Sequence, residues 1–442
     1  METIAPLQQK ERIFILDAVR GIALCGILIL NILSFGRPYQ VYFNLNVLQE
    51  TSFLNVLSWY LTSFVLEGSF RALFSILFGA GAVLIISRLS KSSTGLAPAD
   101  VYYRRLIYLL IFGLINAFVL LWPGDILYSY AICGLLLFPL RNASPRLLIG
   151  LAVFFMVVVM FQEWLRKEDR FEMREKGLAA LAIKEAKKDS LNDDQKEDLQ
   201  KWNGFLEEQK IENIKKKAEK EITKMTAPSY SQIWTHLSPI NIKLETTVFY
   251  KFWFFDVLIF ILFGMAFYKM GIITGEKPLW TYILFIVLGY GLGVGWGYYM
   301  GHTWRLANFD YFEVVKLRSS NWILLYQPHR LLVSMGHLGV IMVLWKSNFF
   351  NWFLKPFANT GQMAFTNYLG QSLICTLIFY GYGFGYFGKF ERFELWYFVF
   401  GVWVFQIIFS VIWMNFFSMG PLEWIWRSLT YWKVQSIKKI AR

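Results

Sequence analysis

Residues 13–35 read IFILDAVRGIALCGILILNILSF, an apolar run whose only charged residues are Asp17 and Arg20. An α-helix of roughly 20 residues crosses a hydrocarbon core about 30 Å thick, so this run is long enough to span a membrane. A secretory signal also contains an apolar segment, but here two charges interrupt it and no small-residue cleavage site follows. We therefore predict that the run is retained as the first transmembrane helix.

The rest of the chain has the same apolar character. Of its 442 residues, 56% are hydrophobic and 19% are aromatic, more than a water-soluble globular protein usually carries. The apolar runs lack the alternation of barrel strands, so the predicted fold is all-α: a polytopic integral membrane bundle of about eleven transmembrane helices. We place the spans at residues 13–35, 52–66, 70–87, 105–122, 125–140, 146–164, 248–269, 279–300, 322–345, 361–384 and 394–417. The pair 52–66 and 70–87 also fits one crossing plus a re-entrant piece.

Charge divides the chain into three regions. Residues 1–164 form an N-terminal membrane half with about six spans, and residues 246–442 form a C-terminal half with about five spans and an interfacial C-terminal helix. Residues 165–245 are highly charged with few apolar side chains, which predicts an extramembrane helical hairpin. Its helices are expected at 176–188 and 194–224, because residues 189–193 offer a stop and a new N-cap. A solvated elaboration without chemistry is the simplest interpretation of this insert.

The short loops set the expected orientation, because Lys and Arg concentrate on the cytoplasmic side. With eleven spans, one side receives most of the basic loop residues: Arg88, Lys91, Arg104, Arg105, Arg141, Arg146, Lys269, Lys277, Lys346 and Lys355. The basic C-terminal residues fall on the same side. We therefore predict a multi-pass protein of the bacterial inner membrane, with its C-terminus in the cytoplasm and its N-terminus and insert outside.

The net charge of +13 does not indicate nucleic acid, since Lys and Arg are spread over loops instead of forming one stripe. The predicted partners are the lipid bilayer and its anionic headgroups. The three cysteines lie in apolar runs, and no zinc spacing, phosphate loop, nucleophile elbow or dinucleotide fingerprint occurs. The sequence thus identifies no metal and no resident cofactor. It leaves homo-oligomer formation open.

Polar residues inside membrane spans are costly and are candidates for function. Asp17, Arg20 and Asn31 share one stripe of the first helix, where a local ion pair between Asp17 and Arg20 is an equally good explanation. Arg330 and His337 share a face of the ninth span. Histidine can transfer protons near neutral pH, so His337 is the candidate general base, although ordinary packing is its alternative.

Two further patterns allow two interpretations each. Asn367 and Gln371 are one turn apart in the tenth span, where their amides either bridge helices or line a polar tunnel. Gly289, Gly293 and Gly297 form a small-residue face in the eighth span, which favours close helix packing over a phosphate site.

The chain resembles the YeiB-like family of bacterial membrane proteins, whose C-terminal region is a domain of unknown function. The residues that carry the resemblance are 16–24 with Asn31, 73–81, 124–127 with Tyr130 and Ala131, 367–368, 371–372, 380–381, and 420–424 with Arg427 and Thr430. The family is distantly similar to membrane acyltransferases, including the lysosomal enzyme that acetylates terminal glucosamine of heparan sulfate. That enzyme has a catalytic histidine about a dozen residues after the matching asparagine, whereas residues 32–51 contain none here. Asn116 stands where many YeiB-like relatives have histidine.

The resemblance implies transfer of an acyl group from a cytoplasmic donor, such as acyl-CoA, to an envelope glycan, a lipid or a small molecule. The residues expected at the reaction centre are His337, Asp17, Arg20, Asn31 and Asn116. Those expected to bind substrate are Asp125, Arg330, Asn367, Gln371, Glu423 and Arg427. Donor phosphates are expected at Arg88, Lys91, Arg104 and Arg105.

Two other functions remain open. The same polar stripe would suit a transporter of a small or lipid-like substrate, although no internal repeat supports two transporter halves. A non-catalytic membrane scaffold that recruits partners through its insert is the third candidate.

Overall fold

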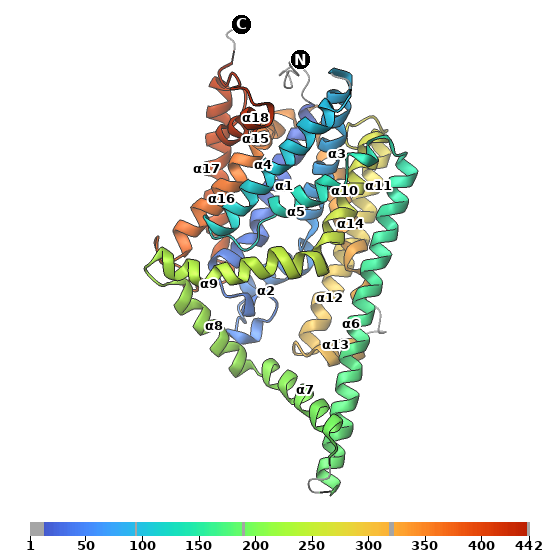
Figure 1. The fold of residues 1–442 in the computed structure, drawn as a ribbon, viewed down its shortest axis with the longest axis vertical. Helices are drawn as coiled ribbons and strands as arrows, with labels where there is room; N and C mark the ends of the chain where they lie inside the picture. Colours follow the sequence, from blue (N-terminus) through green and yellow to red (C-terminus); the bar gives the residue numbers. More distant parts are fainter. Residues whose placement is uncertain (1–12, 93–94, 188–190, 318–321, 440–442) are drawn as a thin grey trace.

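The computed structural model describes residues 13–92, 95–187, 191–317 and 322–439 (Figure 1). These residues fold into helices, and the one β pairing among them is an isolated bridge between Phe417 and Lys438. The predicted fold class, an all-α membrane bundle, is confirmed. Seven described segments are long and apolar enough to cross a membrane. The number of eleven crossings stays a prediction.

The first half contains six α-helices. They are α1 (Phe14–Gly36), α2 (Phe53–Tyr60), α3 (Ser69–Ser92), α4 (Ala97–Phe118), α5 (Leu127–Leu135) and α6 (Pro145–Lys187). Short helices η2 (Tyr39–Val41) and η3 (Leu45–Val47) follow α1, π-helical η4 (Leu61–Val65) follows α2, and η5 (Pro139–Asn142) precedes α6.

The second half continues from the insert. The insert holds α7 (Asp193–Gln209), α8 (Ile211–Met225) and α9 (Tyr230–Lys243), followed by π-helical η6 (Leu244–Trp253) and α10 (Phe254–Lys269). Next come α11 (Leu279–Leu288), π-helical η7 (Gly289–Val294), α12 (Gly295–Leu306), α13 (Tyr311–Leu317) and η8 (Trp322–Leu325). The chain ends with α14 (Tyr326–Lys346), α15 (Asn351–Gln362), α16 (Ala364–Phe379), α17 (Leu395–Phe416) and α18 (Pro421–Tyr431).

The expectation that the N- and C-terminal ends lie on opposite faces is wrong. The start of α1 and the whole of α18 lie at the same end of the bundle, where Asp17 and Glu423 face one cavity (Figure 1). The reason lies in the predicted spans 52–66 and 70–87, which join into one apolar segment from Phe53 to Lys91. If this segment crosses the membrane once and not twice, both ends lie on one side.

Most of the basic loops also meet at that end, which we call the basic end. The Lys269 ammonium donates hydrogen bonds to the carbonyls of Arg141 (2.7 Å) and Ala143 (2.6 Å). The guanidinium of Arg104 lies over the ring of Trp432, just beyond α18. The predicted clustering of basic loops is therefore present in the fold.

Close backbone contacts hold the centre of the bundle together. A Cβ atom on Gly79 of α3 would lie 2.0 Å from the carbonyl oxygen of Ile261 in α10, and one on Gly264 would lie 1.9 Å from that of Ile76. The glycine face of α11–α12 behaves as predicted. Added Cβ atoms at Gly289 and Gly297 would lie 2.4 Å from the carbonyls of Leu332 and Phe64, respectively. Only glycine permits such approaches.

The insert differs from the predicted hairpin. Helix α6 is a single helix of 43 residues, so the predicted span 146–164 and the predicted helix 176–188 are continuous up to residue 187; residue 188 lies outside the described residues. The predicted N-cap is present, because Asn192 accepts a hydrogen bond from Gln195 N and begins α7. The predicted helix 194–224 breaks at Lys210, which is extended. Figure 1 shows the upper part of α6 beside the bundle, its lower part with α7 projecting below the bundle, and α8 leading back to α9, which lies across the bundle.

Candidate functional site

A cavity of about 250 Å³ opens at the basic end, between α1, α3, α4, α5, α16 and α18. Most of its wall is apolar. The apolar lining residues include Leu16, Phe74, Leu77, Phe78, Leu106, Leu109 and Leu127. The charged lining residues are Asp17, Arg20, Arg105, Glu423 and Arg427. Sequence analysis had singled out all five, and the fold brings them together.

Asp17 and Arg20 form a local ion pair on α1. Arg20 Nη1 lies 2.8 Å from Asp17 Oδ1, the spacing of one helical turn. The next residue, Gly21, has no side chain because a Cβ there would lie 2.0 Å from the Phe357 carbonyl of α15. The Asp-x-x-Arg-Gly pattern therefore combines a charged face toward the cavity with close packing against α15.

Three arginine side chains line the cavity: Arg20, Arg105 and Arg427. The guanidinium of Arg105 lies 3.7 Å from the ring centre of Trp426, and Trp426 Nε1 donates to the Arg105 carbonyl (2.9 Å). These contacts fix α18 against α4 and hold the Arg105 side chain in place. Planar guanidinium groups are well suited to bind phosphate or carboxylate oxygens.

Glu423 has a structural role beside its place in the cavity wall. Its Oε1 accepts hydrogen bonds from Phe365 N (2.7 Å) and Thr366 N (3.1 Å), and its Oε2 accepts one from Thr366 Oγ1 (2.5 Å). Burial raises the pKa of Glu423, and these hydrogen bonds oppose that shift. The carboxylate thus caps the positive N-terminal end of α16 and fastens α18 to it.

Two tyrosines, Tyr130 and Tyr368, connect the cavity to polar clusters deeper in the bundle. Tyr130 OH lies 2.9 Å from Ser75 Oγ. Tyr368 OH accepts from Ile126 N (3.1 Å) and lies 3.5 Å from Asp125 Oδ1. Asn116 Nδ2 donates to the same Asp125 oxygen (2.7 Å). Asn116 and Asp125 therefore do not line the cavity, and Asp125 contacts its wall at Tyr368.

Arg330 lies outside the cavity. It forms a buried ion pair with Asp256 of α10, and its Nε donates to the Gly68 carbonyl (3.2 Å). Arg71 Nη2 also approaches Asp256, at 3.6 Å. This cluster joins α3, α10 and α14. Asp256 was missed in the sequence, although an acid in an otherwise apolar helix requires a partner.

His337 does not line the cavity either. Its Nε2 lies 3.0 Å from Ser69 Oγ, its Nδ1 lies 2.8 Å from Tyr290 OH, and its ring stacks on Phe70. Both ring nitrogens are therefore engaged within the protein. This geometry is that of a packed histidine, which was the alternative to the general base.

The amides of α16 bridge helices. Asn367 Nδ2 donates to Ser410 Oγ (2.9 Å), and Gln371 Nε2 donates to Gln406 Oε1 (3.0 Å). Both partners belong to α17. Asn31 is half-buried lower on α1 and does not line the cavity.

Three of the four basic residues expected at donor phosphates do not line the cavity. Arg88 is half-buried and Lys91 is exposed at the end of α3. Arg104 pairs with Asp100 and donates to the Thr430 carbonyl (3.1 Å). Only Arg105 lines the cavity.

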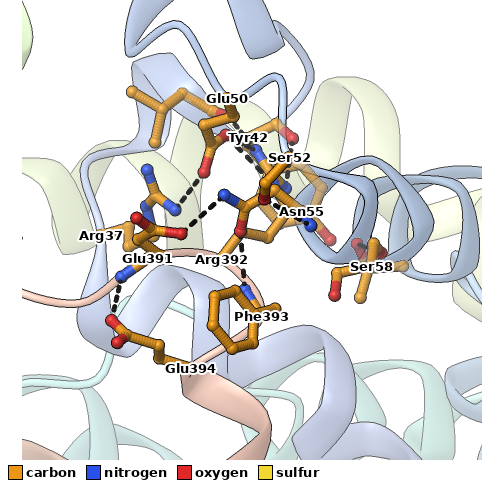
Figure 2. A network of polar contacts seen from close by, with 12 residues as sticks. Arg37, Tyr42, Glu50, Ser52, Asn55, Ser58, Glu391, Arg392, Phe393 and Glu394 are labelled. Carbon is orange, nitrogen blue, oxygen red and sulfur yellow. Dashed lines mark hydrogen bonds and ion pairs between the residues drawn. The ribbon is translucent and has the colours of Figure 1, made fainter.

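At the opposite end, sequence reasoning missed a buried charge network (Figure 2). Glu50 accepts hydrogen bonds from Arg37 and from Arg392, whose Nη2 also donates to the Val41 carbonyl (2.6 Å). Asn55 Nδ2 donates to Glu391 Oε2 (2.9 Å). All these residues lie in loops or at helix ends, where no periodic pattern marks them.

No metal centre of the histidine, cysteine or multi-carboxylate kind is found in the described parts of the chain, where no three such side chains come together. The cysteines Cys25, Cys133 and Cys375 are buried and unbridged.

Comparisons with known proteins agree with the resemblance. Residues 267–433 match the family described as "Protein of unknown function (DUF418)". The chain is 29% identical to the uncharacterized protein YxaH of Bacillus subtilis, with 99% of each chain covered. It is 28% identical to the uncharacterized protein YeiB of Escherichia coli, with 95% of this chain and 96% of YeiB covered. No solved structure matches. Residues 267–433 thus match the DUF418 family, and the chain is similar over nearly its whole length to the YeiB-like proteins.

Proposed function

We propose that this protein is a transmembrane acyltransferase and that the cavity at the basic end holds the acyl group of an anionic donor of the acyl-CoA class. One observation carries the proposal: a mostly apolar wall is combined with Arg20, Arg105 and Arg427 in a single cavity. Burial of an acyl chain in the interior is favourable by roughly 0.8 kcal/mol per methylene. The guanidinium groups would bind the donor phosphates.

The positive-inside rule supports this assignment, because it puts the basic end in the cytoplasm, where acyl-CoA is made. In the reaction, the bond between the acyl carbon and the donor sulfur breaks. A new bond forms from that carbon to an acceptor oxygen or nitrogen, and the acceptor proton ends on the donor thiol. Tyr130 and Tyr368 line the cavity wall and are the groups placed to orient the acyl carbonyl.

The direct test is transfer of label from radioactive acyl-CoA to envelope extract by the purified protein. Gly81→Leu is the informative variant, because Gly81 lines the cavity and an added Cβ there meets no atom within 4 Å. The leucine would fill the cavity without displacing backbone. Gly150→Leu is the matched control, since it also faces open space but lies on α6, outside the cavity.

We expect transfer by the wild type and by Gly150→Leu, and a loss of about tenfold or more in Gly81→Leu, since one methylene in a pocket is worth roughly 1–3 kcal/mol. Absence of transfer above background by folded wild-type protein would remove the proposal. If Gly81→Leu were as active as the wild type, the reaction would not take place in this cavity.

Transport of a lipid-like anion is the second candidate. It is favoured by the polar contacts that continue from Tyr130 through Ser75 to the charge cluster around Asp256. Movement of a labelled amphipathic anion across proteoliposomes, without a covalent product, would support it over acyl transfer.

A further inference from the structure

Asp125, in the turn between α4 and α5, is a buried carboxylate held by neutral groups. It is 5% exposed. Its Oδ1 accepts a hydrogen bond from Asn116 Nδ2 (2.7 Å), and its Oδ2 accepts one from Tyr128 N (2.8 Å). Three other buried carboxylates are instead paired with arginines: Asp17, Glu50 and Asp256. A carboxylate with neutral partners can take up a proton without breaking an ion pair.

The position of this carboxylate depends on Gly113 of α4. A Cβ atom on Gly113 would lie 2.8 Å from Asp125 Oδ2 and 2.5 Å from Tyr128 N. A side chain there would push the carboxylate away from the first turn of α5, whose N–H groups favour a negative charge. The glycine and the amide of Asn116 thus hold Asp125 in one orientation.

Tyr368 of α16 connects Asp125 to the cavity. Its hydroxyl oxygen accepts a hydrogen bond from Ile126 N (3.1 Å). The next residue, Leu127, lines the cavity, and so does Tyr368 itself. The hydroxyl group therefore lies at the part of the cavity wall where α5 begins.

The hydroxyl proton of Tyr368 has two acceptors within reach. The Gly124 carbonyl oxygen lies 3.4 Å from the hydroxyl oxygen, and Asp125 Oδ1 lies 3.5 Å from it. Of these two acceptors, only the carboxylate is basic enough to take the proton. Hydrogen bonds of catalytic groups are often long without substrate and shorten in the complex.

We propose that Tyr368 and Asp125 form a proton relay that activates the acceptor of the acyl group. This inference rests on the proposed acyl transfer and assigns the base in it. Tyr368 is the catalytic residue, because it would touch the acceptor hydroxyl, and Asp125 is a positioning residue that acts through Tyr368. Tyr130 is then the group that remains to orient the acyl carbonyl.

The proton balance of the relay is closed. As the acceptor oxygen bonds to the acyl carbon, its proton passes to the Tyr368 oxygen, and the Tyr368 proton passes to Asp125. The bond between the acyl carbon and the donor sulfur then breaks. The departing thiolate receives a proton back along the same path, so Tyr368 and Asp125 return to their starting states.

The second tyrosine of the cavity supplies a matched control. Tyr130 OH lies 2.9 Å from Ser75 Oγ and 3.4 Å from the Arg71 carbonyl oxygen. Neither group takes up a proton near neutral pH. Tyr130→Phe therefore removes a hydroxyl group from the same cavity without removing a contact to a carboxylate.

The test is a double-mutant cycle on the transfer rate at saturating donor, with Asp125→Asn, Tyr368→Phe and the double variant. Radioactive acetyl-CoA or palmitoyl-CoA is the donor, envelope extract is the acceptor, and rates are expressed per folded molecule. Asp125→Asn keeps the size of the side chain, and Asn116 can turn its amide so that its oxygen accepts from the new one. The dissociation constant of the donor is measured separately by titration.

We expect each single variant to lose about a hundredfold or more in transfer rate, the range for a general base, with unchanged donor affinity. The double variant should lose no more than the worse single variant, because residues that act as a unit are not additive. In contrast, the effect of Tyr130→Phe should add to that of Asp125→Asn.

Two results separate this inference from the proposed function. Transfer by the wild type, with losses that add in the double variant or with donor affinity lost in parallel, would overturn the relay and leave acyl transfer standing. No transfer by folded wild type would remove both. If Asp125→Asn does not fold, Tyr368→Phe decides alone: a loss no larger than that of Tyr130→Phe would overturn the relay.

Discussion

Glu50 and Arg392 are 342 positions apart in the sequence, and they form a buried ion pair in which Arg392 Nη2 lies 3.1 Å from Glu50 Oε2. The other carboxylate oxygen of Glu50 binds Arg37. Burial lowers the pKa of Arg392, and the charge of Glu50 opposes this effect. The pair fastens the loop after α1 to the loop before α17, at the end of the bundle opposite the basic end (Figure 2).

Glu50→Gln should destabilise the protein, because it leaves two buried guanidinium groups without a charged partner. Breaking a buried ion pair from one side costs about 3–5 kcal/mol. Thermal unfolding of the purified protein, followed by tryptophan fluorescence, measures the loss. Glu276→Gln is the control at an exposed acid. If both variants unfold at the wild-type temperature, Glu50 does not hold the two loops together.

Arg427→Gln should weaken binding of an acyl-CoA donor about tenfold to a hundredfold, the range for losing a charged hydrogen bond of roughly 1.5–3 kcal/mol. The effect should be the same for short and long acyl chains, because Arg427 lies in the charged part of the cavity wall. Gly81→Leu should instead discriminate against the longer chain. Titration with donors of two chain lengths separates the effects, with Arg141→Gln as a control at the same end but outside the cavity. A loss in Arg427→Gln that grew with chain length would contradict this division.

His337→Gln should reduce stability and spare acyl transfer. Glutamine can replace one of the bonds to Ser69 and Tyr290 but cannot reproduce both, so a cost of about 1–3 kcal/mol is expected. Activity must be expressed per folded molecule, from unfolding curves and transfer rates of the same preparation. Loss of transfer in a folded variant would restore His337 as a general base.

Gly264→Ala should disturb the contact between α3 and α10 because its methyl group would overlap the backbone carbonyl of Ile76. Backbone atoms cannot rotate away as a side chain can, so a cost of about 1–3 kcal/mol or more is expected. Gly291→Ala adds the same methyl group where no atom lies within 4 Å. The yield of monodisperse protein and its unfolding temperature measure the difference. Similar behaviour of the two variants would show that α3 and α10 can separate at little cost.

Glu221 on α8 gives a pH-dependent prediction. Burial raises its pKa above the usual 4.5, and hydrogen bonds from Gln40 and from the Tyr39 backbone oppose the shift. The folded state therefore binds this proton more tightly than the unfolded state does. The cost of ionising Glu221 is absent below the unfolded pKa and reaches its full value above the folded pKa. Glu221→Gln should thus unfold at a higher temperature than the wild type at pH 8, and the difference should vanish near pH 4. If the difference in unfolding temperature between Glu221→Gln and the wild type were constant from pH 4 to pH 8, the pKa of Glu221 would not be raised in the folded state.

The sequence was sufficient for features that depend on local pattern. The spacing of Asp17 and Arg20 allowed an ion pair as one of two interpretations, and that pair is present. The glycines at 289, 293 and 297 predicted close packing. Helical spacing predicted correctly which side of a helix a residue occupies, but it did not predict which residues lie close enough along the helix to share a site. Asn31 shares the stripe of Arg20, but eleven residues correspond to about 16 Å, which takes Asn31 out of the cavity.

Contacts between distant segments could not be predicted in this way. Arg330 and His337 share a face of α14, but they are seven residues, or about 10 Å, apart along the helix. They therefore contact different partners, Asp256 and Ser69 respectively. Glu50 and Arg392 lie in irregular segments without periodicity. Glu245 resembled any other charged residue of the insert, because its burial depends on how α9 lies across the bundle.

The length of α6 determines how far the insert extends from the bundle. Forty-three residues at about 1.5 Å each give a rod of roughly 65 Å, about twice the thickness of a hydrocarbon core. Near its far end, Trp202 of α7 packs against Gly177, where a Cβ would lie 2.3 Å from the tryptophan side chain. The packing of α7 therefore supports the far part of α6. If α6 crosses the hydrocarbon core at right angles, the far end of the rod lies roughly 30 Å beyond that core.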